Sequence, residues 1–246
     1  MIEEGLRLNR QRGDRRRAAE AQGYLPDLAA WGGDLAQAIE LQRQVLALRR
    51  EIGVARGIAW AHGDLSTWLA EAGRGPEALE HARQAVSLAS EQGDPSLDAY
   101  SRASLALAHL ASGHLGEADR ESSAASSLLP PPRTPLASLF IWSVRARVLL
   151  AREQLDAAET LIDDGLRLAR GHGFVVYELQ GRLFRARLAL ARGRSGEARQ
   201  LASDLAAEAQ AKGFGLIAQR SFQISKQSVE VSARRRSALF QAGSRS

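Results

Sequence analysis

Two stretches of the sequence, RARVLLAR at residues 145–152 and RARLALAR at residues 185–192, are nearly identical and begin 40 residues apart. Self-similarity at a fixed interval of this size is the sequence signature of a repeat protein. Glycines keep the same interval, and Glu153 occupies the one slot that lacks a glycine in this series: Gly33, Gly73, Gly113 and Gly193. The chain is therefore predicted to consist of repeats of 40 residues.

Two further series support this period. An alanine follows five residues after each position of the first series: Ala38, Ala78, Ala118, Ala158 and Ala198. A second glycine series keeps the same step, with Arg133 in its one odd slot: Gly13, Gly53, Gly93, Gly173 and Gly213. Matched positions without gaps exclude a chance pattern.

Each unit is predicted to form two helices joined by a tight turn. Stretches such as 101–111 and 183–191 represent the first helix, and 35–53 and 76–93 the second. Glycine suits the left-handed conformation that ends a helix. Apolar residues at three- and four-residue steps give each helix one buried stripe. The recurring alanine predicts a close crossing of two helices, since only a small side chain fits there.

The composition agrees with a helical protein and limits its chemistry. Alanine, leucine and arginine dominate, and unbranched side chains lose little freedom in a helix. The net charge of +5 comes almost entirely from arginine. This charge fits either an arginine-rich composition or an anionic partner such as nucleic acid. Acidic residues are interleaved along the chain and favour the first interpretation.

The sequence contains no feature of a secreted or membrane protein. It has no cysteine, and its N-terminus lacks the apolar segment of a signal peptide. The longest nearly apolar run, residues 135–144, is too short to span a bilayer. We expect a cytoplasmic protein without membrane partners.

The pattern resembles the tetratricopeptide repeat, a helix–turn–helix unit normally about 34 residues long. The resemblance covers residues 1–222. It rests on the second-helix alanines, on Trp142 and Pro130, and on a small residue of the first helix: Ser66, Ala106, Ala146 and Ala186. It implies an all-α, right-handed superhelix of about five two-helix repeats with partial units at both ends. The longer period is most similar to repeats of bacterial signalling and transcription regulators of the maltose-activator type.

Three segments depart from the regular pattern. Residues 3–13 align with 163–173, the end of a second helix, so we expect the chain to be a fragment of a larger protein with an effector domain upstream. The stretch LLPPPRTP at 128–135 forbids helix and forms a long loop or a hinge. Residues 223–246 are serine-rich and basic and are predicted to be a disordered tail.

A search for catalytic motifs finds none. The sequence lacks a phosphate-binding loop, a dinucleotide motif and a zinc-protease motif. The five histidines do not form a convincing ligand set, and adjacent Asp163 and Asp164 diverge on a helix. The four tryptophans are interpreted as packing residues. We therefore expect neither an enzyme nor a bound cofactor or metal.

The resemblance implies that the first helices line a concave groove that binds partner segments. One groove position recurs in every unit and is predicted to contact the partner: Asp27, Thr67, Leu107, Arg147 and Arg187. Arg147 and Arg187 either hold an acidic segment or a terminal carboxylate, or pair with nearby carboxylates or water.

The predicted function is a non-catalytic scaffold that binds a protein or peptide, or senses a ligand, as the regulatory part of a larger bacterial protein. The effector upstream would be an ATPase, a kinase or a DNA-binding domain. The alternative is a basic solenoid that binds nucleic acid. Helical-repeat proteins that recognise RNA bases need base-contacting residues at fixed positions in every repeat. The five groove residues do not show such a regularity.

Overall fold

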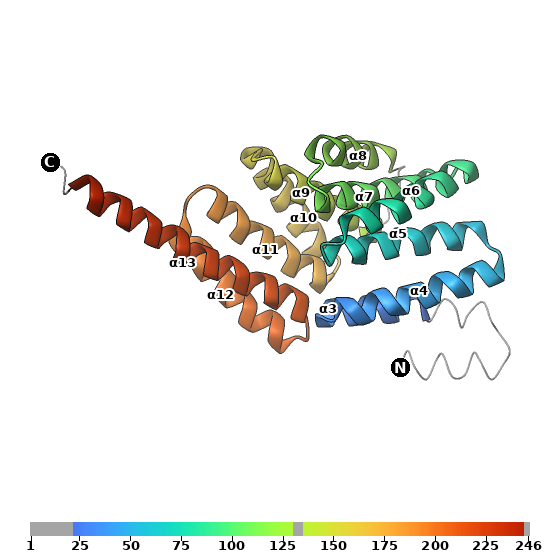
Figure 1. The fold of residues 1–246 in the computed structure, drawn as a ribbon, viewed down its shortest axis with the longest axis horizontal. Coiled ribbons are helices and arrows are strands. Elements are labelled where there is room, and N and C mark those ends of the chain that lie inside the picture. Colours follow the sequence, from blue (N-terminus) through green and yellow to red (C-terminus); the bar gives the residue numbers. More distant parts are fainter. Residues whose placement is uncertain (1–21, 130–134, 244–246) are drawn as a thin grey trace. The chain divides into compact units, whose positions relative to one another are not determined.

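The computed structural model describes residues 22–129 and 135–243, and all regular structure in these ranges is helical (Figure 1). The chain divides into two compact units at Val148 and Leu149. Each unit consists of antiparallel helix pairs. The expectation of an all-α repeat fold is confirmed.

The helices follow the predicted two-helix repeat. Unit 1 contains α3 (Leu25–Gly32), α4 (Leu35–Ile52), α5 (Ala55–Glu71), α6 (Gly75–Gln92), α7 (Pro95–Ala111), α8 (Leu115–Leu128) and most of α9 (Pro135–Ala151). Unit 2 contains α10 (Leu155–Gly171), α11 (Val175–Ala191), α12 (Ser195–Ala211) and α13 (Gly215–Gly243). Odd-numbered helices are the first helices of the repeats, and even-numbered helices are the second.

The turns explain the two glycine series. Both series lie at helix ends, and the described members all have positive φ: Gly33, Gly53, Gly73, Gly93, Gly113, Gly173, Gly193 and Gly213. This left-handed conformation is costly for residues with a Cβ. Glu153 takes the same conformation, with φ of 58°, because the repeat geometry requires it at this slot.

Side-chain caps strengthen some helix starts. The Asp34 carboxylate accepts a hydrogen bond of 2.8 Å from the Gln37 amide at the start of α4. At the start of α7, the Asp94 carboxylate accepts from the Ser96 and Leu97 amides at 3.0 and 3.2 Å. Such caps satisfy amide groups that have no partner within the helix.

The core is built on the small residues of the repeat. The five second-helix alanines, from Ala38 to Ala198, are completely buried. So are the small first-helix residues, from Ser66 to Ala186. Larger side chains such as Leu65, Trp68 and Leu69 fill the space between helices of unit 1. The alanine series therefore marks close helix crossings, as predicted.

First helices of successive repeats are in direct contact. Within unit 1, α5 packs against α7 as well as against its own neighbours α4 and α6. Within unit 2, α11 packs against α13. The described second helices make no comparable contact with one another. The first helices therefore form the inner layer of each unit.

The C-terminal segment differs from the prediction. Helix α13 continues past residue 222 to Gly243, so the described part of the predicted disordered tail is helical. Ile224 and Ser228 are buried one turn apart and extend the apolar stripe beyond the point where the repeat period ends. The first 21 residues and the centre of the proline-rich loop, with the fragment and hinge expectations that concern them, lie outside the described residues.

In the described ranges, every helix is too short or too polar to cross a lipid bilayer.

Candidate binding face

The five predicted groove residues have different environments. Thr67 and Leu107 are buried, 7% and 5% exposed, and Thr67 donates a hydrogen bond of 3.0 Å to the Gly63 carbonyl. Asp27 and Arg147 are half-buried on α3 and α9 of unit 1. Arg187 is half-buried on α11 of unit 2. Two of these positions are therefore packing positions.

Arg147 forms an ion pair with Glu71. Its Nη1 lies 2.5 Å from the Glu71 Oε1, and the two side chains are only 11% and 7% exposed. The pair connects α9 to α5, which lies two repeats earlier in the inner layer. This contact favours the second interpretation of Arg147, pairing with a nearby carboxylate.

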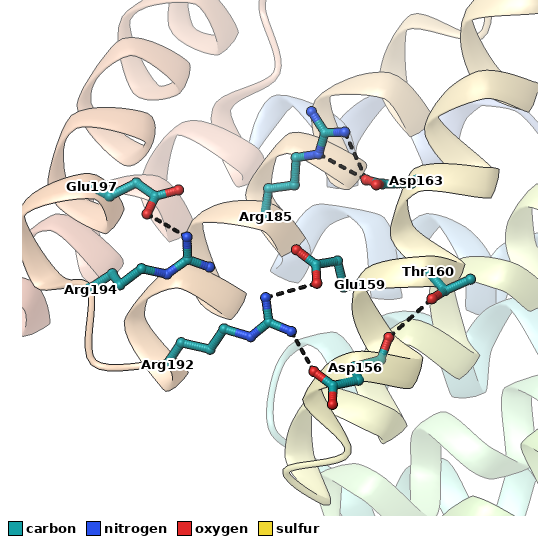
Figure 2. Close-up of polar contacts among 8 residues, drawn as sticks. All are labelled: Asp156, Glu159, Thr160, Asp163, Arg185, Arg192, Arg194 and Glu197. Atoms are coloured by element: carbon teal, nitrogen blue, oxygen red, sulfur yellow. Dashed lines mark hydrogen bonds and ion pairs between the residues drawn. The ribbon is translucent and has the colours of Figure 1, made fainter.

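Arg145 and Arg185, one in each of the two similar stretches, also pair with carboxylates. Arg145 forms a short ion pair with Asp119 and donates to the Ser122 hydroxyl at 3.0 Å. At the equivalent position of the next repeat, Arg185 donates to Asp163 at 2.7 Å (Figure 2). Each of these pairs ties a first helix to the preceding second helix. The repetition of these arginines is therefore architectural.

Figure 2 shows the continuation of this network in unit 2. Arg192 reaches both Asp156 and Glu159 of α10, at 2.7 and 2.8 Å. Arg194 pairs with Glu197 in the first turn of α12 at 2.9 Å. Most of these side chains are substantially exposed, and pairs of this kind contribute little stability each. In each of these pairs the arginine charge faces a carboxylate of the chain itself.

An aromatic row crosses three repeats of unit 1. It consists of Trp60 on α5, Tyr100 on α7 and Phe140 on α9, which are 40 residues apart in sequence. Ring centroids lie 4.1 Å apart for Trp60 and Tyr100 and 4.8 Å apart for Tyr100 and Phe140. All three side chains are half-buried. Both ring pairs are tilted, with interplanar angles of 41° and 34°. Aromatic rings with part of their surface accessible suit contact with a partner.

Two carboxylates lie beside this row. Asp64 is one helical turn from Trp60 on α5, and the Tyr100 hydroxyl donates a short hydrogen bond to its Oδ1. The Gln42 Nε2 of α4 donates to the Asp64 Oδ2 at 3.3 Å and to the Ala61 carbonyl at 3.2 Å. Asp27 on α3 is the second carboxylate. We call Asp27, Gln42, Asp64 and Tyr100 the acidic cluster.

Burial and neighbouring charges shift the pKa values of the acidic cluster. Burial, assisted by the Asp64 charge, raises the pKa of Asp27 from its ordinary value of 3.8 to about 7, against an opposing effect of Arg49. Burial likewise raises the pKa of Asp64, although the hydrogen bond from Tyr100 opposes the shift. Burial and the two carboxylates hold the Tyr100 pKa well above 10. Two carboxylates in one half-buried site resist simultaneous ionisation.

Gly63 makes room for this arrangement. A Cβ at this position would lie 2.6 Å from the Tyr100 Cε1 and 3.4 Å from the Ser104 hydroxyl oxygen. The absence of a side chain therefore allows the Tyr100 ring to approach α5 closely enough to bond Asp64.

The histidines form two close pairs. The Nδ1 atoms of His62 and His81 are 2.9 Å apart, and those of His109 and His114 are 3.5 Å apart. His62 is 2% exposed, and burial, with the neighbouring His81 and Arg50 charges, lowers its pKa to about 4. Among the described residues, no group of three or more histidine, aspartate or glutamate side chains is arranged to hold a metal ion.

The comparison with protein families matches residues 17–91 to the family described as Tetratricopeptide repeat. The matched segment includes α3 to α5 and most of α6, the helices that carry Asp27, Gln42, Trp60 and Asp64.

This part of the chain, residues 17–91, is similar to tetratricopeptide repeats.

Solved structures of tetratricopeptide-like repeats share the fold. A putative kinesin light chain repeat protein from Podosopora anserina has 21% identity and a TM-score of 0.51, covering 78% of this chain and 94% of that one. A Rap protein complexed with Competence and Sporulation Factor has 14% identity and a TM-score of 0.56. The match covers 94% of this chain and 66% of the Rap protein. Aspartyl phosphate phosphatase F from Bacillus subtilis has 13% identity and a TM-score of 0.53. The match covers 85% of this chain and 59% of the phosphatase. No curated protein matches the sequence.

Tetratricopeptide repeats are generally scaffolds for protein–protein interactions. The inner layer of unit 1 carries both the aromatic row and the acidic cluster. The sequence contained a signal for the row, because its three aromatic residues share one slot of the repeat. Nothing in the sequence indicated that Gln42 of a second helix and Asp27 of another repeat meet Asp64. We call the aromatic row and the acidic cluster together the candidate binding face.

Proposed function

We propose that this tetratricopeptide-repeat chain is a non-catalytic interaction scaffold, and that its candidate binding face holds an extended segment of a partner protein. The observation that carries this proposal is the aromatic row. Three half-buried rings at 40-residue intervals pack against one another at a tilt and form a row over α5, α7 and α9. Aromatic anchors of this kind supply much of the energy in protein interfaces.

The paired arginines support a protein partner over a nucleic acid. Phosphate binding needs arginines whose charge is available to the partner. In this chain, arginines of both units instead form ion pairs with aspartates and glutamates, as Arg102 does with Glu121 and Arg182 with Glu208. The aromatic row is also flanked by carboxylates, which repel a phosphate backbone.

The biological setting that we propose is the regulatory part of a larger cytoplasmic protein of bacterial signalling or transcription control. The long repeat period supports it, and so do the folds of a Rap protein solved with Competence and Sporulation Factor and of a Bacillus subtilis aspartyl phosphate phosphatase. An ATPase, kinase or DNA-binding domain would precede the repeats. Sequencing the coding region upstream of Met1 tests this setting, and an in-frame stop codon immediately upstream would contradict it.

The proposal of an acidic partner segment depends on Arg147 and Arg187. For Arg147 the Glu71 carboxylate competes with any such segment. Measuring partner affinity after replacing both arginines with alanine tests this proposal. Unchanged affinity would remove it.

Selection of peptides on the intact chain tests the interaction function itself. Random dodecapeptides displayed on phage are selected on the immobilised full chain, and enriched peptides are synthesised and titrated. We expect Trp60→Ala to weaken their binding roughly tenfold or more, because it removes an aromatic anchor. Phe222→Ala, a ring 59% exposed on α13, is the matched control and leaves affinity unchanged. Failure to enrich any peptide, or equal effects of the two variants, would contradict the proposed function.

A further inference from the structure

The candidate binding face holds two carboxyl groups close to one another. Asp27 and Asp64 lie together on α3 and α5, and Arg49 of α4 is the cation whose charge acts on both. The Arg49 Nη1 donates instead to the Gly57 carbonyl at 2.9 Å. Neither carboxylate forms an ion pair with a side chain in the described ranges. A bound cation would therefore be stabilised at this site.

An unused acceptor lies in the same cluster. Gln42 is only 1% exposed, and its Nε2 points at the Asp64 carboxylate. Its Oε1 has no hydrogen-bond partner among the described residues. A buried polar atom without a partner costs roughly 1–3 kcal/mol. The cluster thus presents acceptors from Asp27, Asp64 and Gln42 and calls for a ligand with several donors.

The aromatic row selects among cations. Tyr100 belongs both to the row and to the cluster, and Trp60 lies 4.1 Å from it, ring centroid to ring centroid. A cation over an aromatic face gains additional attraction, and a guanidinium also stacks on the ring as a flat group. Guanidinium has five donors and no acceptor, which complements a site built of acceptors.

We propose that the acidic cluster and the aromatic row together bind the guanidinium group of one arginine side chain in the partner peptide. The Asp27 and Asp64 carboxylates and the Gln42 Oε1 accept its hydrogen bonds, and the Trp60 and Tyr100 rings contact its face. This inference rests on the proposed function and specifies the residue type that the partner presents at this site.

A small-molecule titration tests the site without requiring a partner. N-acetyl-arginine amide and the neutral, equally shaped N-acetyl-citrulline amide are titrated into the full chain while tryptophan fluorescence and amide NMR shifts are recorded. We expect the arginine compound to bind roughly tenfold or more tightly than citrulline, since charge-assisted hydrogen bonds are the stronger ones. Equal binding of the two compounds, or none by either, would overturn the inference.

Variants locate the binding. The double variant Asp27→Asn with Asp64→Asn preserves shape and removes both charges, and it abolishes the preference for arginine over citrulline. The control variant Asp163→Asn with Asp164→Asn makes the same chemical change on the exposed side of α10. We expect it to keep the preference for arginine over citrulline. Circular dichroism confirms that both variants fold. A preference retained in the first variant would overturn the assignment to this cluster.

Peptides separate this inference from the proposed function. Peptides enriched on the chain should contain an arginine whose replacement by citrulline weakens binding roughly tenfold or more. Peptides that bind through Trp60 but lose nothing on this replacement would overturn the arginine site and leave the interaction function standing. Failure to enrich any peptide contradicts the interaction function, and the small-molecule titration then decides on the arginine site alone.

Discussion

At the scale of single residues, the repeat imposes conformations and charges that the individual residue does not favour. Glu153 adopts a left-handed backbone because the turn between the two helices of its repeat requires one. The equivalent positions of the other repeats are glycines. Asp27 is held with a pKa of about 7 because burial and Asp64 oppose its ionisation. Both residues therefore store unfavourable free energy that a substitution can release.

Glu153→Gly should stabilise the protein. The left-handed conformation costs a residue with a Cβ roughly 1 kcal/mol, and part of the gain is lost to the greater freedom of glycine in the unfolded chain. We expect the free energy of unfolding in urea to rise by about 0.5 kcal/mol. Gly193 has a φ of 76°, and Gly193→Glu makes the reverse change. We expect this variant to lower the free energy of unfolding. A decrease for Glu153→Gly would show that the Glu153 side chain makes a compensating contact.

Asp27→Asn should stabilise the protein in a pH-dependent manner. A carboxyl group whose pKa is higher in the folded state than its ordinary 3.8 favours folding at low pH and opposes it increasingly as pH rises toward about 7. The advantage of the variant over the wild type should therefore be small at pH 4 and grow to the order of 3 kcal/mol at pH 8.

Urea unfolding of both proteins at several pH values measures this difference. Comparing the two proteins cancels the contributions of other groups, among them His62, whose lowered pKa opposes folding increasingly as pH falls from about 6.5 to about 4. If the stability difference between Asp27→Asn and the wild type did not depend on pH, Asp27 would ionise in the folded protein without a cost in stability.

At the scale of helices, some ion pairs join a first helix to the preceding second helix, whereas the Arg147–Glu71 pair joins first helices two repeats apart. Arg145 and Arg185 connect their helices to the preceding second helix. Arg147 instead reaches Glu71, 76 residues earlier in the chain. This pair is much less exposed than the others and therefore carries a larger penalty if one partner is lost.

Arg147→Ala should destabilise unit 1 by about 3 kcal/mol, because it removes a cation that lies against the nearly buried Glu71 carboxylate. The double variant with Glu71→Ala should recover a large part of that loss, which a double-mutant cycle by thermal unfolding measures. Arg185→Ala, from an exposed pair, is the matched control and costs less than about 1 kcal/mol. Additive effects of Arg147 and Glu71 would contradict an energetic coupling between them.

At the scale of the whole molecule, the chain is an array of similar repeats in two compact units. In such arrays each repeat contacts its neighbours, and stability is approximately a sum of local terms. All four tryptophans, Trp31, Trp60, Trp68 and Trp142, belong to unit 1. Tryptophan fluorescence therefore reports on unit 1, whereas circular dichroism reports on both units.

Leu166→Ala in unit 2 and Leu65→Ala in unit 1 test this locality. Each leucine is 1% exposed, and its truncation should cost about 2–5 kcal/mol. We expect Leu65→Ala to shift the fluorescence transition in urea and Leu166→Ala to shift mainly the circular dichroism transition. Equal shifts of the fluorescence midpoint would show that the two units unfold as one.

The sequence alone determined the repeat, the two-helix unit, its boundaries and its buried alanines. These features are local, since a glycine with positive φ or an alanine at a helix crossing recurs with the period and depends on neighbouring residues. Only the tertiary structure decided which side chains form the candidate binding face and that α13 continues beyond residue 222. Asp27, Gln42, Asp64 and Tyr100 come from four helices, and their meeting depends on the spacing between repeats and on the absence of a side chain at Gly63. Such contacts are set by packing across repeats, which a periodic sequence pattern does not encode.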